Sequence, residues 1–296
     1  MVLLTGASGF LGKIIYKEFS PNIITLGRSS ISDICSDLST GIPVLRKFDL
    51  VIHVAGKAHS VPKTDLEKQQ FYDINVGGTL NLLKGLEDSV LPKMFVFISS
   101  VSVYGQEIGK SINENHSLDA KDPYGLSKIE AEKLILDWCK ANNVICTILR
   151  LPLLVGENPP GNLGAMINAI KKGYYFNIGG GIAKKSMVLA QDVASFIPKV
   201  AIIGGVYNLT DGYHPDFNEL STAISKNIHK KQPYNLPLLI AKIMGFLGDF
   251  LGDKSPINSS KLKKITSDLT FDDTKARERL GWNPRGVLEY LKSNRL

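Results

Sequence analysis

The stretch MVLLTGASGFLG, residues 1–12, decides the fold of this chain. Its opening residues, up to Thr5, form an apolar run that predicts a short strand buried on both faces. A glycine turn follows at once, and residues 10–19 carry apolar side chains at helical spacing. A strand, a tight turn and a helix in this order predict the first half of a β–α–β unit.

The glycines of this turn have the spacing GxxGxxG. Glycines at such positions allow a tight turn and let a pyrophosphate approach the backbone, while free N–H groups at the helix N-terminus meet its charge. Elsewhere in a chain the same spacing is more often an ordinary turn. Between a strand and a helix it predicts a dinucleotide-binding site, whose expected members are Gly6, Ser8, Gly9, Phe10, Leu11 and Gly12.

Strands and helices are predicted to alternate along the first 150 residues. Further apolar runs with the length of buried strands lie at residues 23–26, 50–55, 94–100 and 144–149. Helices are predicted at residues 71–86 and 122–140. The alternation predicts an α/β fold, a doubly wound parallel sheet of the Rossmann type, which binds ligands beyond the carboxyl ends of its strands.

The pattern loosens after Arg150, where prolines and glycines mark turns and irregular segments. Residues 1–155 are therefore predicted to form the dinucleotide-binding domain, joined by a returning strand within residues 187–211. Residues 156–186 and 212–296 are predicted to form a smaller, C-terminal substrate-binding lobe.

The composition is that of an ordinary globular protein. Of 296 residues, 44% are hydrophobic and 21% are charged, which gives no sign of disorder. The net charge of +7 would suit an anionic partner, but the lysines and arginines are scattered rather than packed into one tract, and aromatic residues are not interleaved with them. We therefore expect no nucleic-acid partner.

The cysteines and the apolar segments limit the other possibilities. Three cysteines without CxxC or Cys/His spacing predict no metal site and no disulfide framework. The N-terminus lacks the features of a secretory signal, which places the protein in the cytoplasm. Residues 236–251, LPLLIAKIMGFLGDFL, are too few for a transmembrane helix and include Lys242 and Asp249. They predict an amphipathic helix packed in the smaller lobe, with a membrane-surface helix as the alternative.

The second predicted strand leads into Gly27, Arg28 and Ser29, where many NAD-binding folds carry an acidic residue that binds the adenosine ribose. A guanidinium here can bind a 2′-phosphate through charge-assisted hydrogen bonds, helped by the hydroxyl of Ser29 or Ser30. The residues therefore favour NADP(H) over NAD(H). The alternative is that Arg28 is an exposed loop arginine without a ligand.

Tyr124 and Lys128 belong to the sequence YGLSK, where helical spacing places them one turn apart on the same face. An ammonium beside a phenol favours the phenolate and is expected to lower the phenol pKa. The YxxxK spacing alone is weak evidence, because both residues are common on helix surfaces. It gains weight from Ser99 and Ser100, which end an apolar strand where a hydroxyl can meet a substrate oxygen.

In this order the motifs resemble those of the extended short-chain dehydrogenase/reductases, the NAD-dependent epimerase/dehydratase family. The resemblance covers essentially the whole chain, through TGASGFLG at 5–12, VIHVAG at 51–56, INVGGTLNLL at 74–83, SSVSVYG at 99–105, YGLSK at 124–128, LRLPLLVG at 149–156 and DTKARERLGWNP at 273–284. It implies a catalytic triad of Ser100, Tyr124 and Lys128. HVAGK at 53–57, where many members have HLAA, is a departure without an evident consequence.

The resemblance also implies the remaining binding residues. Asp37 and Leu38 would face the adenine, and Asn75 would support the site. The other residues implied to contact the cofactor, besides Tyr124 and Lys128, are Ala55, Gly56, Lys57, Ser99 and Pro152. Substrate contacts are implied for Ser60, Ser100, Tyr124, Asn162, Lys184 and Lys185, although a solvated basic pair is the alternative for the two lysines. Family members often form homodimers through the helices that carry Asn75 and Tyr124.

Within the family, the order of segments is most similar to bacterial reductases of UDP-4-keto-6-deoxy-N-acetylhexosamines. The similarity implies an NADPH-dependent reduction of the C4 keto group, with Tyr124 as proton donor, to a UDP-N-acetylquinovosamine or fucosamine type of sugar for surface polysaccharide. A UDP-sugar 4-epimerase with tightly bound NAD shares the triad and is the alternative. A 4,6-dehydratase is disfavoured, because its chemistry needs an additional acid and base near the triad serine, and Val101 and Ser102 of this chain supply neither. An NADPH-sensing regulatory protein is disfavoured by the intact triad.

Overall fold

A seven-stranded sheet forms the centre of the computed structural model, which describes residues 1–58, 62–250 and 258–294. All its neighbouring strands are parallel, in the order β11-β7-β5-β4-β1-β2-β3. The strands are β1 (Val2–Thr5), β2 (Ile23–Gly27), β3 (Ile34–Cys35), β4 (Leu50–His53), β5 (Met94–Ser100), β7 (Ile145–Leu151) and β11 (Gly205–Asn208). The doubly wound parallel sheet predicted from the sequence is therefore confirmed.

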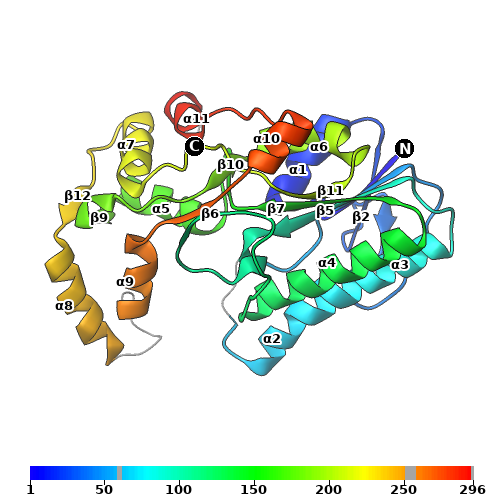
Figure 1. The fold of residues 1–296 in the computed structure, drawn as a ribbon, viewed down its shortest axis with the longest axis horizontal. Coiled ribbons are helices and arrows are strands. Elements are labelled where there is room, and N and C mark those ends of the chain that lie inside the picture. Colours follow the sequence, from blue (N-terminus) through cyan, green and yellow to red (C-terminus); the bar gives the residue numbers. More distant parts are fainter. Residues whose placement is uncertain (59–61, 251–257, 295–296) are drawn as a thin grey trace.

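Helices cover both faces of this sheet, as Figure 1 shows. One face carries α1 (Phe10–Phe19), α6 (Ala190–Ala201) and α10 (Thr274–Leu280), and the other carries α2 (Asp65–Tyr72), α3 (Gly78–Glu87) and α4 (Pro123–Ala141). Neighbouring residues of a strand point to opposite faces, so Leu3 packs in one apolar core and Leu4 in the other, both fully buried. Burial on both faces explains why the strands are apolar throughout.

The helix predicted over residues 71–86 is interrupted. Between α2 and α3 the chain forms a π-helical turn, Asp73–Gly77, with Asn75 buried inside it. A π turn inserts an extra residue into the helical repeat and is frequent at functional sites. The predicted helix at 122–140 is observed as α4, whose N-terminus is capped by the Asp122 carboxylate, which accepts a hydrogen bond from the N–H of Gly125 at 3.0 Å.

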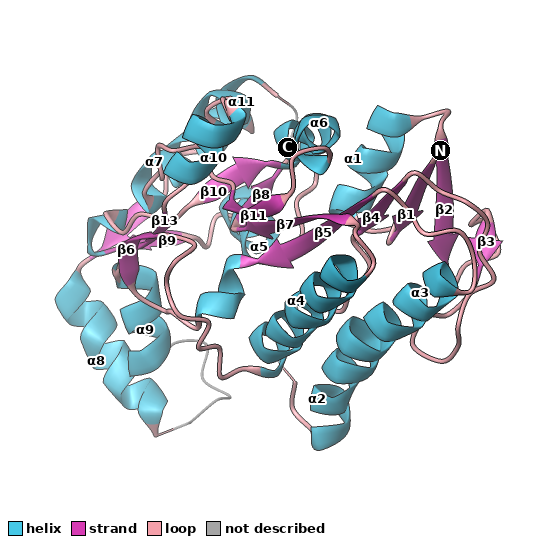
Figure 2. Ribbon diagram, turned by 45° about the vertical axis from the view of Figure 1, so that its right-hand side comes forward, coloured by secondary structure: helices cyan, strands magenta, loops and turns pink. Residues whose placement is uncertain are grey.

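The smaller lobe is built from short strand pairs and helices. Its strands are β6 (Gly109–Ile112) paired with β13 (Leu269–Phe271), β8 (Leu153–Val155) with β10 (Met187–Leu189), and β9 (Phe176–Ile178) with β12 (Tyr234–Leu236). Its helices are α5 (Gly161–Lys172), α7 (Phe217–Asn227), α8 (Leu238–Asp249), α9 (Ser259–Thr266) and α11 (Val287–Ser293). Figure 2 shows α8 at the outer edge of the molecule, with α9 beside it.

The structure divides the second half of the chain differently from the predicted boundaries. Within the predicted returning segment, β10 pairs with β8 outside the main sheet, and only β11 joins the sheet, beside β7. The predicted lobe segment 212–296 contains α10 and Trp282, which pack against α6 in the core of the dinucleotide-binding domain. The indole N–H of Trp282 donates to the carbonyl of Thr210 at 2.9 Å, so the chain returns to the first domain before α11.

The apolar segment 236–251 forms α8, while Leu251 lies outside the described residues. Its buried residues are Ala241, Gly245 and Gly248, whereas its large apolar side chains are exposed. The expectation of a helix that packs its apolar side inside the lobe is therefore wrong. No helix in the described part of the chain is both long and apolar enough to cross a membrane.

The β1–α1 turn leaves no room for a side chain at Gly12. A Cβ atom there would lie 2.0 Å from the carbonyl oxygen of Gly6, and neither backbone segment can yield easily. We expect Gly12→Ala to lower the free energy of unfolding by about 3 kcal/mol, measured by urea denaturation. Gly41→Ala is the control, because nothing lies within 4 Å of a Cβ at that position. Equal losses in the two variants would contradict the steric argument.

Candidate active site

The glycine turn brings the end of β1 against the loop that follows β4. Gly6 has a φ of +74°, and a Cβ atom there would lie 2.6 Å from the backbone nitrogen of Ala55. Gly9 forms the N-cap of α1, and Ser8 and Gly9 are exposed. The turn therefore presents a helix N-terminus and bare backbone beside Ala55 and Gly56. These features fit the pyrophosphate of a dinucleotide.

His53, at the end of β4, connects the end of β1 to helix α3 through two side-chain hydrogen bonds. The hydroxyl of Thr5 accepts hydrogen bonds from the N–H groups of Val54 and Ala55, so its proton goes to Nδ1 of His53 at 2.7 Å. The hydroxyl of Thr79 donates to the carbonyl of Asn75 and therefore accepts from Nε2 of His53 at 3.0 Å. Burial lowers the pKa of His53 to about 3, so the ring is neutral and its tautomer is set by its partners.

Asn75 holds the loop after β4 in place. Its carboxamide oxygen accepts from the N–H of Lys57 at 2.6 Å, and its amide donates to the Lys57 carbonyl at 3.1 Å and to the Ser127 hydroxyl at 2.8 Å. Because Ser127 lies on α4, Asn75 links the loop that carries Ala55 and Gly56 to the helix that carries Tyr124 and Lys128. The supporting role of Asn75 in a cofactor site and the direct cofactor contacts of these loop residues stay predictions.

The end of β2 offers an exposed cation where many NAD-binding folds place a carboxylate for the ribose. Arg28 and Ser29 are exposed. The nearby acid is Asp33, whose Oδ2 accepts from the N–H and from the hydroxyl of Thr25, both at 2.8 Å. These hydrogen bonds hold the pKa of Asp33 below its usual value and engage one of its two carboxylate oxygens. This end of the strand is therefore suited to an anionic group.

Asp37 and Leu38 follow β3. The Asp37 carboxylate accepts from the hydroxyl and the N–H of Ser39, and these hydrogen bonds contribute to lowering its pKa. Leu38 is 8% exposed, and its side chain packs in the core below the sheet, while its carbonyl accepts from Asn81 at 2.7 Å. An adenine contact by Leu38 would therefore involve little of its side chain.

Ser100 and Tyr124 come together at the carboxyl end of β5. Ser100 caps the 3₁₀ turn Val101–Tyr104, where its Oγ accepts from the Ser102 N–H at 3.2 Å. Burial is the largest influence on Tyr124 and raises its pKa, while a side-chain hydrogen bond with Ser100 acts in the opposite direction. The phenol is therefore neutral at neutral pH and able to donate a proton.

Lys128 lies below this pair, 5% exposed. Its ammonium donates to the carbonyl of Ile98 at 2.7 Å and lies 3.8 Å from the centroid of the Phe97 ring. Burial lowers its pKa to about 7, although Glu132 acts to raise it. The expected lowering of the Tyr124 pKa by Lys128 is not what this structure shows, because burial dominates at both groups.

A buried polar chain continues from this site into the core. Glu132 accepts from the hydroxyl of Ser99 at 2.5 Å and forms a two-pronged ion pair with Arg150, at 2.7 and 3.1 Å. Arg150 also donates to the Tyr104 hydroxyl at 3.0 Å, which in turn donates to Asn208 of β11 at 2.8 Å. The Ser99 hydroxyl therefore gives its proton to Glu132 and could offer the predicted cofactor contact only as an acceptor. Sequence reasoning missed this chain, since no local pattern marks it.

Three of the predicted substrate residues, Asn162, Lys184 and Lys185, lie in the second lobe. Asn162 and Lys184 are exposed, on α5 and just before β10 respectively. The ammonium of Lys185 donates to the main-chain carbonyls of Lys264 and Ser267 at 3.0 and 2.9 Å, so it closes the C-terminal end of α9. Its predicted direction toward a diphosphate is not observed. Ser60 lies outside the described residues.

Pro152 and Phe10 mark where the two parts meet. Pro152 stands between β7 and β8, at the carboxyl end of the sheet. The Phe10 ring, at the start of α1, packs so closely against Gly156 that a Cβ there would lie 2.9 Å from it. The glycine turn is therefore in contact with the segment that leads into the second lobe.

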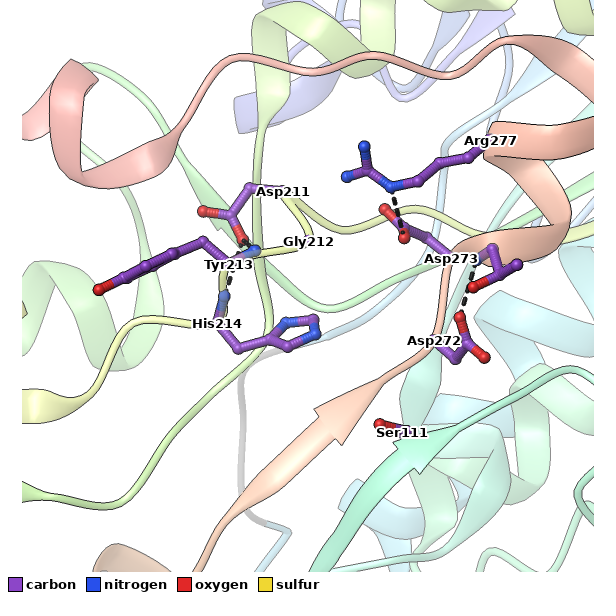
Figure 3. A pocket seen from close by; sticks show the side chains of 9 residues that line it. Ser111, Asp211, Gly212, Tyr213, His214, Asp272, Asp273 and Arg277 are labelled. Atoms are coloured by element: carbon purple, nitrogen blue, oxygen red, sulfur yellow. Dashed lines mark hydrogen bonds and ion pairs between the residues drawn. The ribbon is translucent and has the colours of Figure 1, made fainter.

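A separate hollow of about 480 Å³ lies between β11 and α10, and Figure 3 shows its lining. Asp211 accepts from the N–H groups of Tyr213 and His214, and Asp273 pairs with Arg277 at 2.8 Å. None of the residues that line this hollow belongs to the glycine turn or the triad. We assign it no part in the reaction.

Removing one partner of the buried ion pair tests whether it supports α4. Glu132→Ala leaves the Arg150 guanidinium buried without a carboxylate, which we expect to lower the free energy of unfolding by about 3–5 kcal/mol in urea denaturation. Glu130→Ala, at an exposed position on the same helix, should change it by less than about 0.5 kcal/mol. A loss as small for Glu132→Ala would show that the pair contributes nothing.

The depressed pKa of Lys128 makes stability depend on pH. A lysine in the unfolded chain titrates near 10.4, so between about pH 7 and pH 10 the unfolded state binds one more proton than the folded state. We expect the free energy of unfolding of the cofactor-free protein to rise with pH in this window, by up to about 1.4 kcal/mol per pH unit. Lys128→Met should remove this slope and Lys133→Met, at an exposed position, should keep it.

Known proteins resemble the whole chain. It is 30% identical over 302 residues to the N-acetyl-α-D-glucosaminyl-diphospho-ditrans,octacis-undecaprenol 4-epimerase of Escherichia coli O157:H7. The aligned region covers 93% of this chain and 88% of the relative. It is 27% identical to the UDP-glucose 4-epimerase of Vibrio cholerae, with coverage of 97% and 92%. The GDP-6-deoxy-D-mannose reductase of Pseudomonas aeruginosa is 33% identical over 147 residues, 46% of each chain.

Solved structures share the fold. MoeE5 in complex with UDP-glucose and NAD matches with a TM-score of 0.76 and 20% identity, covering 98% of this chain and 95% of that one. RMD from Pseudomonas aeruginosa complexed with NADPH matches with a TM-score of 0.71 and 22% identity, covering 99% and 97%. The model of the NAD dependent epimerase/dehydratase family matches residues 2–208. The chain therefore belongs to the NAD dependent epimerase/dehydratase family.

Proposed function

We propose that this protein is an NADPH-dependent reductase of nucleotide sugars. It reduces the C4 keto group of a UDP-4-keto-6-deoxy-N-acetylhexosamine to a hydroxyl, which yields a UDP-N-acetylquinovosamine or UDP-N-acetylfucosamine type of sugar for surface polysaccharide. The observation that carries the cofactor choice is the exposed Arg28 at the end of β2, where many NAD-binding folds place an acid, combined with the two hydrogen bonds that hold Oδ2 of Asp33 against Thr25. The guanidinium of Arg28 can bind a 2′-phosphate through charge-assisted hydrogen bonds, in competition with the Asp37 carboxylate, whose pKa the positive charge of Arg28 helps to lower.

The neutral state of Tyr124 supports the reductive direction. Reduction of a ketone needs a hydride, which the bound dinucleotide supplies, and a proton for the forming alkoxide. Burial raises the pKa of Tyr124, so the phenol holds its proton at neutral pH and gives it to the C4 oxygen. Ser100 hydrogen-bonds the same oxygen, and Lys128 holds the ribose beside the nicotinamide.

The relatives support the substrate class. A reductase from Pseudomonas aeruginosa, whose name specifies a GDP-6-deoxy-sugar, resembles half of this chain, and the matching RMD structure was solved with NADPH. The names of this reductase and of the epimerases all specify a sugar linked through a diphosphate, which is the substrate class that we propose here. The identity of the nucleotide and of the sugar is our inference from the order of segments in the sequence.

A 4-epimerase is the second candidate. The relatives that cover nearly the whole chain are named as 4-epimerases, one of UDP-glucose and one of a polyprenyl-diphosphate-linked N-acetylglucosamine. Such an enzyme oxidises C4 and returns the hydride to the opposite face, with no net consumption of dinucleotide. It would use the same Ser100, Tyr124 and Lys128.

A single absorbance measurement distinguishes the two candidate functions. With NADPH and a UDP-4-keto-6-deoxy-N-acetylglucosamine generated by a dehydratase, we expect the absorbance at about 340 nm to fall. Tyr124→Phe should slow this by on the order of 10²–10⁴, whereas Tyr16→Phe, at an exposed position on α1, should not. Arg28→Asp should shift the preference from NADPH toward NADH.

Other outcomes would overturn the reductase. Interconversion of UDP-N-acetylglucosamine and UDP-N-acetylgalactosamine, or of the corresponding polyprenyl-diphosphate sugars, without net loss of NADPH or NADH would make the protein an epimerase. Equal rates with both cofactors in the wild type and in Arg28→Asp would contradict the role of Arg28.

A further inference from the structure

Helix α8 turns its large apolar side chains outward. Seven of them are between 44% and 76% exposed, namely Leu239, Ile240, Ile243, Met244, Phe246, Leu247 and Phe250, which caps the helix. We call these seven residues the α8 face. A surface helix of a globular protein normally places such residues toward the core. An exposed apolar patch of this kind marks an interaction surface.

The other side of the helix explains how it is attached. Ala241, Gly245 and Gly248 are buried, and a Cβ atom at Gly245 would lie 3.4 Å from the Ser259 nitrogen and 3.5 Å from Leu262. The carboxylate of Asp249 accepts hydrogen bonds from the N–H and the hydroxyl of Ser259, at 2.9 and 2.6 Å. Small residues and a helix cap thus fasten α8 to α9, which leaves the large side chains free.

The seven side chains form one continuous face. At 100° per residue they fall within an arc of about 160° around the helix axis, with no charged residue inside it. Lys242 and Asp249 lie just outside one edge of this arc. A helix with a broad apolar face bordered by charge is typical of helices that lie in the plane of a membrane interface.

The excess of positive charge lies in the segment of the chain that carries this face. Residues 226–266 contain eight lysines, two aspartates and no arginine or glutamate, which is a net +6 of the chain's +7. Among the described residues, Lys242 on α8 and Lys263 on α9 are exposed, and so are Lys230 and Lys231 ahead of β12. Although the basic residues as a whole are scattered, their excess over acids belongs to the segment that carries α8.

We infer that the α8 face binds the surface of an anionic lipid bilayer. The apolar side chains enter the boundary between head groups and acyl chains, and the exposed lysines of residues 226–266 meet the negative surface potential. A second copy of the chain fits less well, because pairing two α8 faces would bring two segments of charge +6 together. The 12 residues of α8 span about 18 Å, too little to cross a bilayer.

Binding to the bilayer would hold the smaller lobe at the membrane surface. This inference does not depend on the reaction, since α8 contains none of the residues of the candidate active site. It is therefore tested without substrate or cofactor, and its failure leaves the proposed reductase untouched.

Co-sedimentation of the full-length protein with vesicles tests the inference. We expect binding to vesicles of phosphatidylcholine with about 30% phosphatidylglycerol and markedly less binding to pure phosphatidylcholine or in about 1 M salt. The variant Ile243→Ser/Phe246→Ser/Leu247→Ser should reduce the partition coefficient by on the order of tenfold or more. Lys242→Gln/Lys263→Gln should weaken binding mainly at low salt.

The matched control replaces three equally exposed apolar residues elsewhere. Ile31→Ser/Val44→Ser/Ile202→Ser should bind like the wild type, because these residues, 90%, 92% and 63% exposed, lie far from α8 in the sequence. All replaced positions are exposed, so folding should be retained and is checked by circular dichroism. No binding by the wild type, or equal loss in both triple variants, would overturn the inference. So would a dimer in analytical ultracentrifugation that dissociates in the α8 variant, without any vesicle binding.

Discussion

The close approach of the backbone at Gly6 to the backbone at Ala55 is the constraint on which the site depends. The two segments follow neighbouring parallel strands, β1 and β4, and a single Cβ at Gly6 would lie 2.6 Å from the Ala55 nitrogen. The hydroxyl of Thr5 fastens them, because it accepts from two backbone N–H groups and donates to His53. As a result the N-terminus of α1 opens beside the loop at residues 54–57, where a pyrophosphate can be held.

Helix α4 connects this region to the chemistry and to the core. Tyr124, Lys128 and Glu132 recur every four residues and therefore share one face of the helix. Tyr124 forms a hydrogen bond with Ser100, and Lys128 donates to a carbonyl of β5. Glu132 forms the ion pair with Arg150. Burial raises the pKa of Tyr124 and lowers that of Lys128, so it favours the neutral form of both groups. The same burial that stabilises the helix thus sets the protonation state of the site.

The second lobe has smaller sheets and leaves more apolar surface exposed on α8. Its short strand pairs are far smaller than the main sheet, and α10 and Trp282 leave it to pack in the core of the first domain. Within it, α8 is fastened by alanine and glycine and exposes its large side chains. An arrangement that removes so little apolar surface from water implies that another apolar phase covers it.

The sequence alone determined the elements whose signals are local. The apolar runs predicted β1, β2, β4, β5 and β7 within a few residues, the GxxGxxG spacing predicted the turn, and the helical pattern over residues 122–140 predicted α4. The order of motifs also identified the family. These features depend on strand and helix periodicity, on the lack of a side chain at glycine and on capping, all of which act between residues close in sequence.

Only the tertiary structure decided what surrounds each group. The sequence placed Lys128 one turn from Tyr124, but burial and a strand carbonyl govern its charge. It assigned Ser99 to the cofactor, but the hydroxyl of Ser99 gives its proton to Glu132. It placed the apolar side of α8 inside the lobe, but the residues that face inward are Ala241, Gly245 and Gly248. Desolvation, hydrogen-bond partners and exposure are set by elements distant in sequence, which no local pattern encodes.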